Sequence, residues 1–169
     1  MTERWLARRA LMALAAGLIV SASRYAAAEA GACHDLVGTY LTKNYAKGES
    51  GEHFTSRSLI ALSGSGQASF TDSGEGGEKG FGPFTDGRGA WRCVEANKVH
   101  AVTLDFTTPT AEAPKAEIGR LEFDLAYDPA AKTIKGTATL ALVPLGSDPL
   151  KPGQGGRQFE ITGERVEAP

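Results

Sequence analysis

Histidine and cysteine are scarce in this chain of 169 residues, which contains three histidines and two cysteines. No two histidines have the His-x-x-x-His spacing of a metal site, and no Cys-x-x-Cys pair is present. The sequence also lacks the Gly-Lys-Ser/Thr ending of a phosphate-binding loop and the Gly-x-Ser-x-Gly elbow of a serine hydrolase. We therefore predict no metal, no cofactor and no catalytic site, and we favour a non-enzymatic role.

Clusters of basic residues and long apolar runs are absent after residue 28. Without residues 1–28 the chain keeps 14 Lys and Arg against 19 Asp and Glu, a net charge of −5. A nucleic-acid partner, which needs a basic surface, is not expected. No later apolar run approaches the roughly 20 residues that cross a bilayer, so we expect no stable membrane insertion of the processed chain.

The first 28 residues have the three parts of a secretory signal. A positively charged start is followed by an uncharged run of eleven residues, Ala10 to Val20, and then by small residues. Candidate cleavage sites precede Glu29 and Gly31. The sequence thus predicts a cleaved signal peptide over 1–28, a domain over 29–169, and a periplasmic or secreted protein.

Three alternatives for this start stay open. The apolar run could remain as an uncleaved anchor. The pair Arg8-Arg9 could direct the twin-arginine route, although its alanine neighbours match that signal poorly. Cys33, which follows Ala30-Gly31-Ala32, could be a lipoprotein acylation site, although it lies far beyond the apolar run.

Both cysteines, Cys33 and Cys93, belong to the part that is predicted to be exported. An even count in an oxidising compartment favours a disulfide. Closing a loop of about 60 residues would stabilise the fold by about 4 kcal/mol on the chain-entropy account. Two free thiols and a metal site are the alternatives, and a disulfide between Cys33 and Cys93 is the prediction.

The remainder of the chain shows a period of two in its apolar residues and little helical periodicity. In the range 118–127, for example, Leu121, Phe123 and Leu125 alternate with charged residues. We predict eight strands, over 36–44, 58–62, 67–72, 89–95, 98–106, 118–127, 133–143 and 158–166. Mostly short links with turn-forming residues join them, so the strands form an antiparallel meander.

Such a sheet must hide its apolar face and its edges. A single eight-stranded antiparallel up-and-down barrel does this by closure, and it is the all-β fold that we predict. A two-sheet β-sandwich is the alternative. In an immunoglobulin-like sandwich a Trp usually stands soon after the first Cys, whereas here Trp91 stands two residues before the second.

Leu36-Val37-Gly38-Thr39-Tyr40 opens the first predicted strand with a Gly-x-aromatic motif. At the start of an eight-strand meander, this motif resembles the entry of the lipocalin-like (calycin) small secreted β-barrel proteins. In this chain Tyr40 stands where that family usually has Trp. The resemblance implies a small closed barrel that binds an apolar ligand in its mouth.

Three residues on predicted strands are candidate ligand contacts. His100 shares a face with Val102 and Leu104, so it could point into the barrel and orient a ligand; a strand-end His satisfied by backbone or water is the alternative. Trp91 lies on the face of Cys93, which predicts burial near the disulfide. Tyr40 belongs to the entry motif.

The glycine-rich connection 73–88 is the longest within the meander and carries Phe81 and Phe84. A loop of this length can gate a ligand, or its two rings can plug one end of the barrel. A second long connection spans 144–156. The charged row Arg120, Glu122 and Asp124 is interpreted as the solvated outer face of a strand rather than as a catalytic set.

Three functions follow in order of preference. The first is an exported, non-enzymatic carrier of a small apolar ligand, because an eight-stranded barrel can hold one such molecule. The second is an extracytoplasmic interaction or inhibitor protein that contacts an envelope protein through its loops. The third is a barrel-type isomerase or cyclase, which needs several polar residues inside the barrel, whereas the alternating rows supply few. The sequence sets no oligomeric state.

Overall fold

Eight antiparallel strands form one sheet, and the sheet closes in a ring because β8 pairs with β1. The structure is a computed structural model that describes residues 33–48, 51–77, 82–151 and 155–169. The predicted signal peptide and Phe81 lie outside these ranges. The elements are η1 (His34–Leu36), β1 (Gly38–Gly48), β2 (Gly51–Leu62), β3 (Gln67–Asp72), β4 (Gly87–Glu95), β5 (Lys98–Phe106), β6 (Glu117–Asp128), β7 (Thr133–Pro144) and β8 (Arg157–Arg165).

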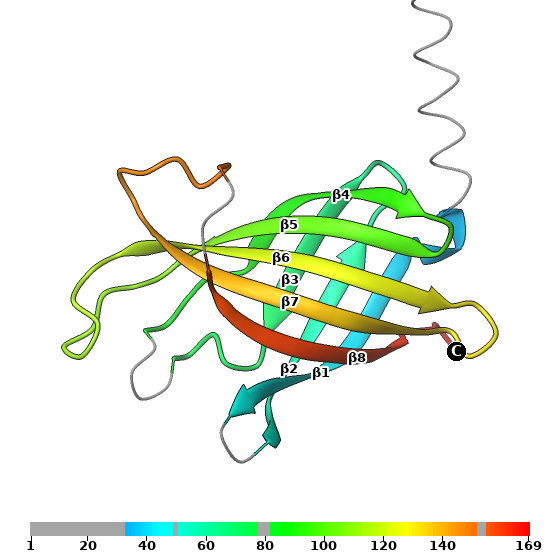
Figure 1. Cartoon of the computed structure of the whole chain (residues 1–169), viewed down its shortest axis with the longest axis horizontal. Helices are drawn as coiled ribbons and strands as arrows, with labels where there is room; N and C mark the ends of the chain where they lie inside the picture. Colours follow the sequence, from blue (N-terminus) through cyan, green and yellow to red (C-terminus); the bar gives the residue numbers. More distant parts are fainter. Residues whose placement is uncertain (1–32, 49–50, 78–81, 152–154) are drawn as a thin grey trace, which may run out of the picture.

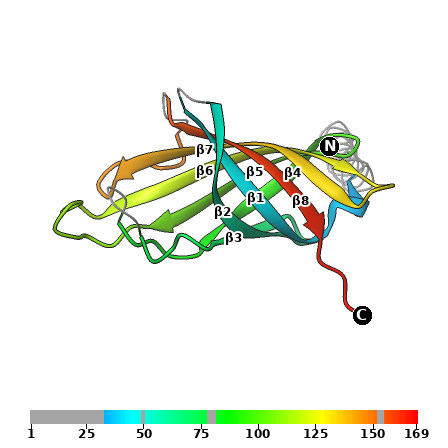
Figure 2. The same cartoon turned by 90° about the horizontal axis from the view of Figure 1, so that it is seen from below.

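Each strand pairs with the next one along the chain. Figure 1 shows β5 to β7 on the near side of the ring, with β1 to β3 crossing behind them. In the view from below, β8 lies beside β1, where the ring closes (Figure 2). The prediction of an all-β up-and-down barrel is confirmed, and the two-sheet sandwich is excluded.

The two ends of the barrel differ. Short connections 63–66, 96–97 and 129–132 lie at one end together with η1, and we call this the closed end. The described parts of the connections 73–86, 107–116 and 145–156 lie at the other, the open end (Figure 1, left). Because a ligand enters a barrel through its more accessible mouth, the open end is where a site is expected.

Alternate residues of each strand point inward and build one core. On β6, the inward row contains Leu121, Phe123, Leu125 and Tyr127, as the sequence pattern predicts. On β5, Val99 and Ala101 are about 1% exposed and belong to the same core. Phe70 of β3 and Phe123 of β6 meet across the interior, with ring centroids 5.6 Å apart.

The closed end is sealed by η1 and by the start of β1. Leu36 and Tyr40 are fully buried, and the Tyr40 hydroxyl donates to the Leu36 carbonyl oxygen at 2.9 Å. Burial raises the pKa of Tyr40 to about 12, so its hydroxyl remains a donor. The Arg165 guanidinium, from the end of β8, donates to the carbonyl oxygens of Asp35 and Val37.

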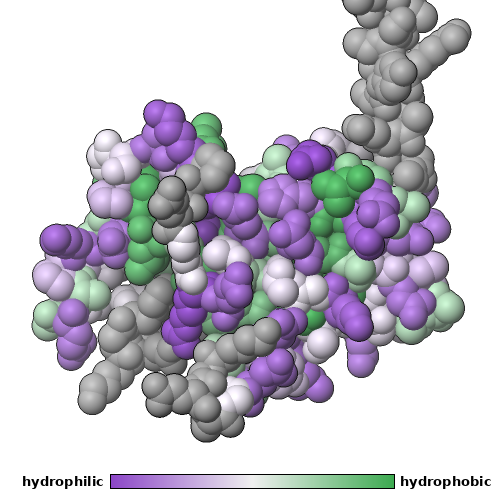
Figure 3. All heavy atoms as spheres, viewed as in Figure 1, coloured by the Kyte–Doolittle hydropathy of each residue, from purple (hydrophilic) through white to green (hydrophobic). Residues whose placement is uncertain are grey.

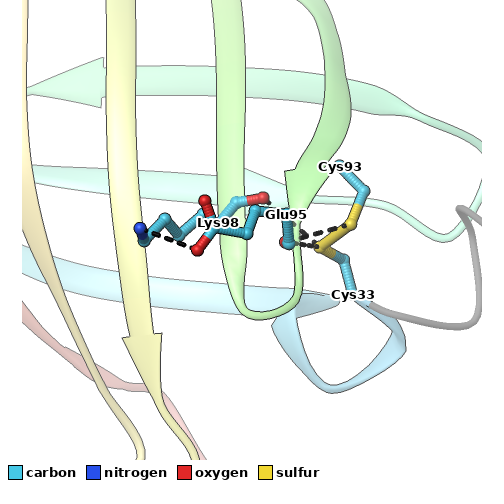
Figure 4. Close-up of a disulfide and its surroundings, with 4 residues drawn as sticks. All are labelled: Cys33, Cys93, Glu95 and Lys98. Atoms are coloured by element: carbon cyan, nitrogen blue, oxygen red, sulfur yellow. Dashed lines mark hydrogen bonds and ion pairs between the residues drawn. A yellow bond between two sulfur atoms is a disulfide. The ribbon is translucent and has the colours of Figure 1, made fainter.

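A disulfide links Cys33 to Cys93 beside the turn between β4 and β5 (Figure 4). The two Cα atoms lie 5.8 Å apart, and Cys33 is fully buried. In the same turn, Lys98 Nζ lies 2.9 Å from Glu95 Oε1. The disulfide therefore fastens the segment before η1 to the wall of the barrel, and the predicted pairing is confirmed. A sulfur atom in this bond cannot also carry a lipid thioether.

Strand β2 is longer than the predicted range 58–62, because it begins at Gly51. Residues 51–57 pair with β1 up to Gly48 and are mostly exposed. They carry no apolar alternation, so the pattern on which the prediction rested is missing there. The backbone ladder continues past the packed core, and this extension forms the hairpin at the bottom of Figure 1.

Candidate functional site

A cavity of about 110 Å³ opens at the open end, inside the ring. A water molecule needs about 10–15 Å³ on the same measure, so the cavity has room for a small organic molecule. Its apolar lining residues are Phe70, Phe84, Leu121, Phe123, Ala138, Leu140, Phe159 and Ile161, and its polar lining residues are Asn44, Thr55, Ser56, Asp72, Asp105 and Arg157.

Asp72, the last residue of β3, is the centre of a hydrogen-bond network on one wall. Its Oδ2 accepts from Ser58 Oγ at 2.6 Å, Ser56 Oγ at 2.9 Å and Asn44 Nδ2 at 3.0 Å. The three donors lie on β1 and β2, and each is on the inward row of its strand. These neutral donors stabilise the carboxylate and fix its position without cancelling its charge.

The same carboxylate anchors the start of the 73–86 connection. The Gly74 N–H donates to Asp72 Oδ1 at 2.7 Å, and the Asp72 N–H donates to Glu75 Oε1 at 2.9 Å. Further on, the Phe84 N–H donates to the Glu75 carbonyl oxygen at 3.0 Å, and Phe84 forms a β-bridge with Thr107. The described parts of this connection are therefore fastened to β3 and to the β5–β6 connection.

Asp105 is a second carboxyl group in the cavity wall, near the end of β5, and it is only 3% exposed. Burial raises the pKa of Asp105 to about 6. A hydrogen bond from the Gly119 backbone partly opposes this rise, and the Glu75 carboxylate adds to it. Gly119 is the partner of Asp105 in the β5–β6 ladder, and a Cβ at position 119 would collide with the carboxyl group. Glycine at 119 thus makes the space that Asp105 occupies.

Arg157 is the basic residue among those lining the cavity, and it lies at the start of β8. It is exposed, and its guanidinium carbon is 5.2 Å from the centroid of the Phe159 ring. Its charge therefore lies at the mouth, where water screens it, whereas Asp72 and Asp105 lie in the protein interior.

The structure separates the five sequence-predicted ligand contacts. Phe84 lines the cavity and packs against the core, while Phe81 lies outside the described residues. Tyr40 is buried at the closed end. Trp91 points inward beside the disulfide-bonded Cys93 and donates from Nε1 to the Ser63 carbonyl oxygen at 2.9 Å. Trp91 is only partly buried near the disulfide, where burial was predicted, and neither it nor Tyr40 lines the cavity.

His100 points outward, so the hypothesis that it could face the interior as a ligand contact is wrong. Its Nδ1 lies 2.9 Å from Oδ1 of Asp124, its cross-strand partner on the outer face. The inward row of β5 is instead made by Val99, Ala101, Thr103 and Asp105. Both rows of β5 are rich in apolar residues, and the pattern therefore did not identify the buried face.

The interior holds more polar side chains than the sequence pattern indicated. Asn44, Ser58, Thr103 and Asp105 are all buried on inward rows, which removes the reason given for ranking a barrel-type isomerase last. The sequence could have identified such residues, because each stands an even number of positions from a buried aromatic residue of its strand. Asn44 shares the row of Tyr40, and Asp72 shares the row of Phe70.

The outward charged row of β6 is solvated only in part. Asp124 is exposed, but the Arg120 side chain is 7% exposed and its guanidinium pairs with Glu122. Arg120 Nε has no hydrogen-bond partner among the described residues. Arg120 is therefore buried although its row faces outward.

Comparisons with known proteins give no match: no family model, no curated protein and no solved structure is similar to this chain. In the part of the chain that the structure describes, no helix has the length and apolar character needed to cross a membrane. Within those same residues, no three His, Cys, Asp or Glu side chains are grouped so that they could hold a metal ion.

Proposed function

We propose that this protein is an exported carrier that binds a small, largely apolar ligand in the open end of its barrel. The observation that carries the proposal is the cavity of about 110 Å³. Its walls include three phenylalanines of the barrel strands, Phe70, Phe123 and Phe159. Mostly apolar concave sites with a few placed polar groups are typical of small-molecule binding.

The way the cavity is supported also favours ligand binding. Its lining side chains stand on paired strands, and the ring of strands is complete. The closed end is filled by Leu36 and Tyr40, so ligand access is from the open end alone among the described parts of the barrel. A rigid wall costs little ordering entropy when a ligand binds.

Export is the second part of the proposal. A disulfide is persistent mainly in oxidising compartments, and the Cys33–Cys93 bond therefore supports a periplasmic or secreted location. The signal-like sequence over 1–28 points to the same location. The resemblance to lipocalin-like barrels is in accord with this proposal and remains part of it.

The outer surface gives less support to a role in protein–protein contact. On the face shown in Figure 3, hydrophobic residues occur in separate groups among hydrophilic ones. Scattered exposed apolar residues are normal on a soluble surface and do not by themselves mark a partner site. The interior cavity is therefore the better candidate for the functional site.

A fluorescent probe tests the carrier proposal. We expect the neutral probe N-phenyl-1-naphthylamine to bind the processed protein with enhanced emission. Replacing Phe84, which lines the cavity, by Ala should weaken probe binding about five- to thirtyfold, since roughly 1–2 kcal/mol of apolar contact is lost. Fluorescence titration measures the change.

Phe106 provides the matched control because it is also near the open end but is 56% exposed and points outward. Phe106→Ala should leave probe affinity within about twofold. Thermal melts of both variants show whether the Phe84 ring is part of the packed core that fills this end of the barrel. In that case Phe84→Ala should lower the free energy of unfolding by about 3–5 kcal/mol. Failure of the unmodified protein to bind this probe and smaller aromatic compounds alike would exclude the carrier proposal.

A further inference from the structure

The cavity has a polar wall and an apolar wall. Asn44, Ser56, Asp72 and Asp105, from β1, β2, β3 and β5, make the polar side. The strands β6 to β8 present Leu121, Phe123, Leu140, Phe159 and Ile161. A molecule that fills the cavity therefore meets hydrogen-bonding groups on one side and hydrocarbon on the other.

The charge on the polar wall is negative. Two carboxyl groups, Asp72 and Asp105, line the cavity, and they are 9% and 3% exposed. Among the described residues, neither forms an ion pair with a Lys, Arg or His side chain; the basic lining residue, Arg157, is exposed at the mouth. Buried charges are normally paired, so binding of a cation beside these two carboxyl groups would be favourable.

The two carboxyl groups contribute differently. Asp72 accepts hydrogen bonds from Asn44, Ser56, Ser58 and the Gly74 N–H, which nearly fills the lone pairs of its two oxygens. It therefore supplies a fixed negative charge. Asp105 accepts from the Gly119 backbone, and the described structure shows no side-chain donor to it. Asp105 thus keeps acceptor capacity for a ligand.

The residues beside Asp105 fix where its carboxyl group lies. Gly119, its partner on β6, has no Cβ, and the carboxyl group occupies the space that a Cβ there would take. Two residues back, the Thr103 hydroxyl is 1% exposed and has no hydrogen-bond partner among the described residues. The inward row of β5 therefore holds two buried polar groups, Thr103 and Asp105, whose hydrogen-bonding capacity is not filled by the described residues.

We infer that the ligand is a small organic ammonium ion, an amine with an apolar body, whose ammonium group binds Asp105 in the field of Asp72. This inference rests on the proposed carrier function and specifies its ligand class. The ammonium would donate charge-assisted hydrogen bonds to the Asp105 carboxylate, while the apolar body contacts Phe123, Phe159 and Ile161. A carboxylate ligand would instead be repelled by both aspartates.

Amine binding should depend on pH, because only the ionised Asp105 attracts an ammonium ion. Burial raises the pKa of Asp105 to about 6. The other charged groups about the cavity are Asp72 on β3, Glu75 in the following connection, and Arg157 on β8. Protonation of Asp105 below about pH 6 should weaken amine binding and leave a neutral ligand nearly unaffected.

Calorimetric titration with three matched compounds tests the inference. These are 2-phenylethylamine, 2-phenylethanol and 3-phenylpropionate, which share an aromatic body and differ in the charge of the head group. At about pH 7.5 we expect the amine to bind at least roughly tenfold more tightly than the alcohol, and the acid to bind most weakly. Asp105→Asn should remove the advantage of the amine and leave alcohol affinity within about twofold.

Glu112→Gln is the charge-matched control, since Glu112 is exposed on the 107–116 connection and does not line the cavity. It should preserve the preference for the amine. A second measurement uses the unmodified protein: between about pH 7.5 and about pH 5, amine affinity should fall about tenfold and alcohol affinity should not. This second measurement decides the matter even if the Asp105 variant fails to fold.

The outcomes separate this inference from the carrier proposal. Equal affinities for amine and alcohol, or tighter binding of the acid, would overturn the ammonium inference and leave the carrier proposal standing. Binding of N-phenyl-1-naphthylamine without binding of the amine would have the same meaning. Absence of binding by the probe and by all three compounds would overturn both.

Discussion

Asp105 is a charged residue buried in the inward row of β5. It ends a row of Val99, Ala101 and Thr103, and it is buried with them. An ionised carboxyl group at such a place costs free energy unless a cation compensates it. In the ligand-free protein, the ionised Asp105 carboxyl group therefore lowers the free energy of unfolding.

Asp105→Asn should therefore stabilise the protein at neutral pH. Since the folded-state pKa of about 6 exceeds the unfolded value of 3.8, the native protein binds this proton more tightly, and stability falls as pH rises between these values. At about pH 7.5 we expect the free energy of unfolding of Asp105→Asn to exceed that of the unmodified protein by about 2–3 kcal/mol.

Urea unfolding at several pH values measures this effect. Near pH 4 the gain should vanish, because the carboxyl group is then protonated in the folded protein. Glu112→Gln, on an exposed connection, should show no comparable change with pH. A variant that is less stable than the unmodified protein at about pH 7.5 would mean that the Asp105 charge is compensated within the fold.

Some residues could be placed from the sequence and others could not. The pairing of Cys33 with Cys93 followed from their even number, and it is confirmed. His100 was placed on the wrong face, because β5 has apolar residues in both rows and periodicity cannot choose between them. Asn44 and Asp72 were missed because a polar residue in an inward row resembles a break in the pattern rather than a part of a site.

At the scale of elements, the bounds of three strands were predicted best. β3 and β5 have the predicted bounds, and β6 differs by one residue at each end. β3 and β6 alternate cleanly, so their pattern also reports their burial, whereas the pattern of β5 gave its bounds without identifying its buried face. β2 was predicted at less than half its length, because residues 51–57 are held by the backbone ladder with β1 and carry no buried row.

At the closed end, one arginine side chain connects three elements. Arg165, at the end of β8, donates to the Asp35 and Val37 carbonyl oxygens beside η1 and to the Tyr127 hydroxyl on β6. No sequence pattern marks this residue, because its partners are mostly backbone atoms that are distant along the chain. Its guanidinium has the several donors that such a junction requires.

Arg165→Met should lower the free energy of unfolding by about 2–3 kcal/mol, since methionine keeps the apolar stem but leaves the carbonyl oxygens without a donor. Affinity for N-phenyl-1-naphthylamine should stay within about twofold, because the cavity lies at the opposite end. Urea unfolding and probe titration provide the two readouts.

Arg92→Met serves as the control for that variant, as Arg92 is exposed on the outer face of β4. Its free energy of unfolding should change by less than about 0.5 kcal/mol. Equal stability losses in the two variants would show that Arg165 has no special role in closing the barrel. A large loss of probe affinity in Arg165→Met would show that the two ends are coupled.

At the scale of the whole molecule, barrel closure could be predicted because an eight-strand meander with one apolar face has few ways to hide it. The division of the interior into a polar and an apolar wall could not. That division depends on which strands become neighbours across the ring: Asp105 of β5 and Asn44 of β1 line one cavity although they are distant along the chain. The ligand-binding properties proposed above emerge only at this scale.

The closed barrel, the disulfide and the proposed export combine in one final prediction. Intact mass spectrometry of the protein recovered from an oxidising compartment should find a chain that begins at Glu29 or Gly31 and lacks the two thiol hydrogens of the reduced form. Alkylation without reductant should add no label, and alkylation after reduction should add two. A retained Met1 would contradict signal cleavage. An acylated Cys33 would contradict the disulfide itself, since the same sulfur cannot form both bonds, and the segment before η1 would then lose its covalent tie to β4. In a chain whose disulfide closes a loop of about 60 residues, that loss would lower stability by up to about 4 kcal/mol.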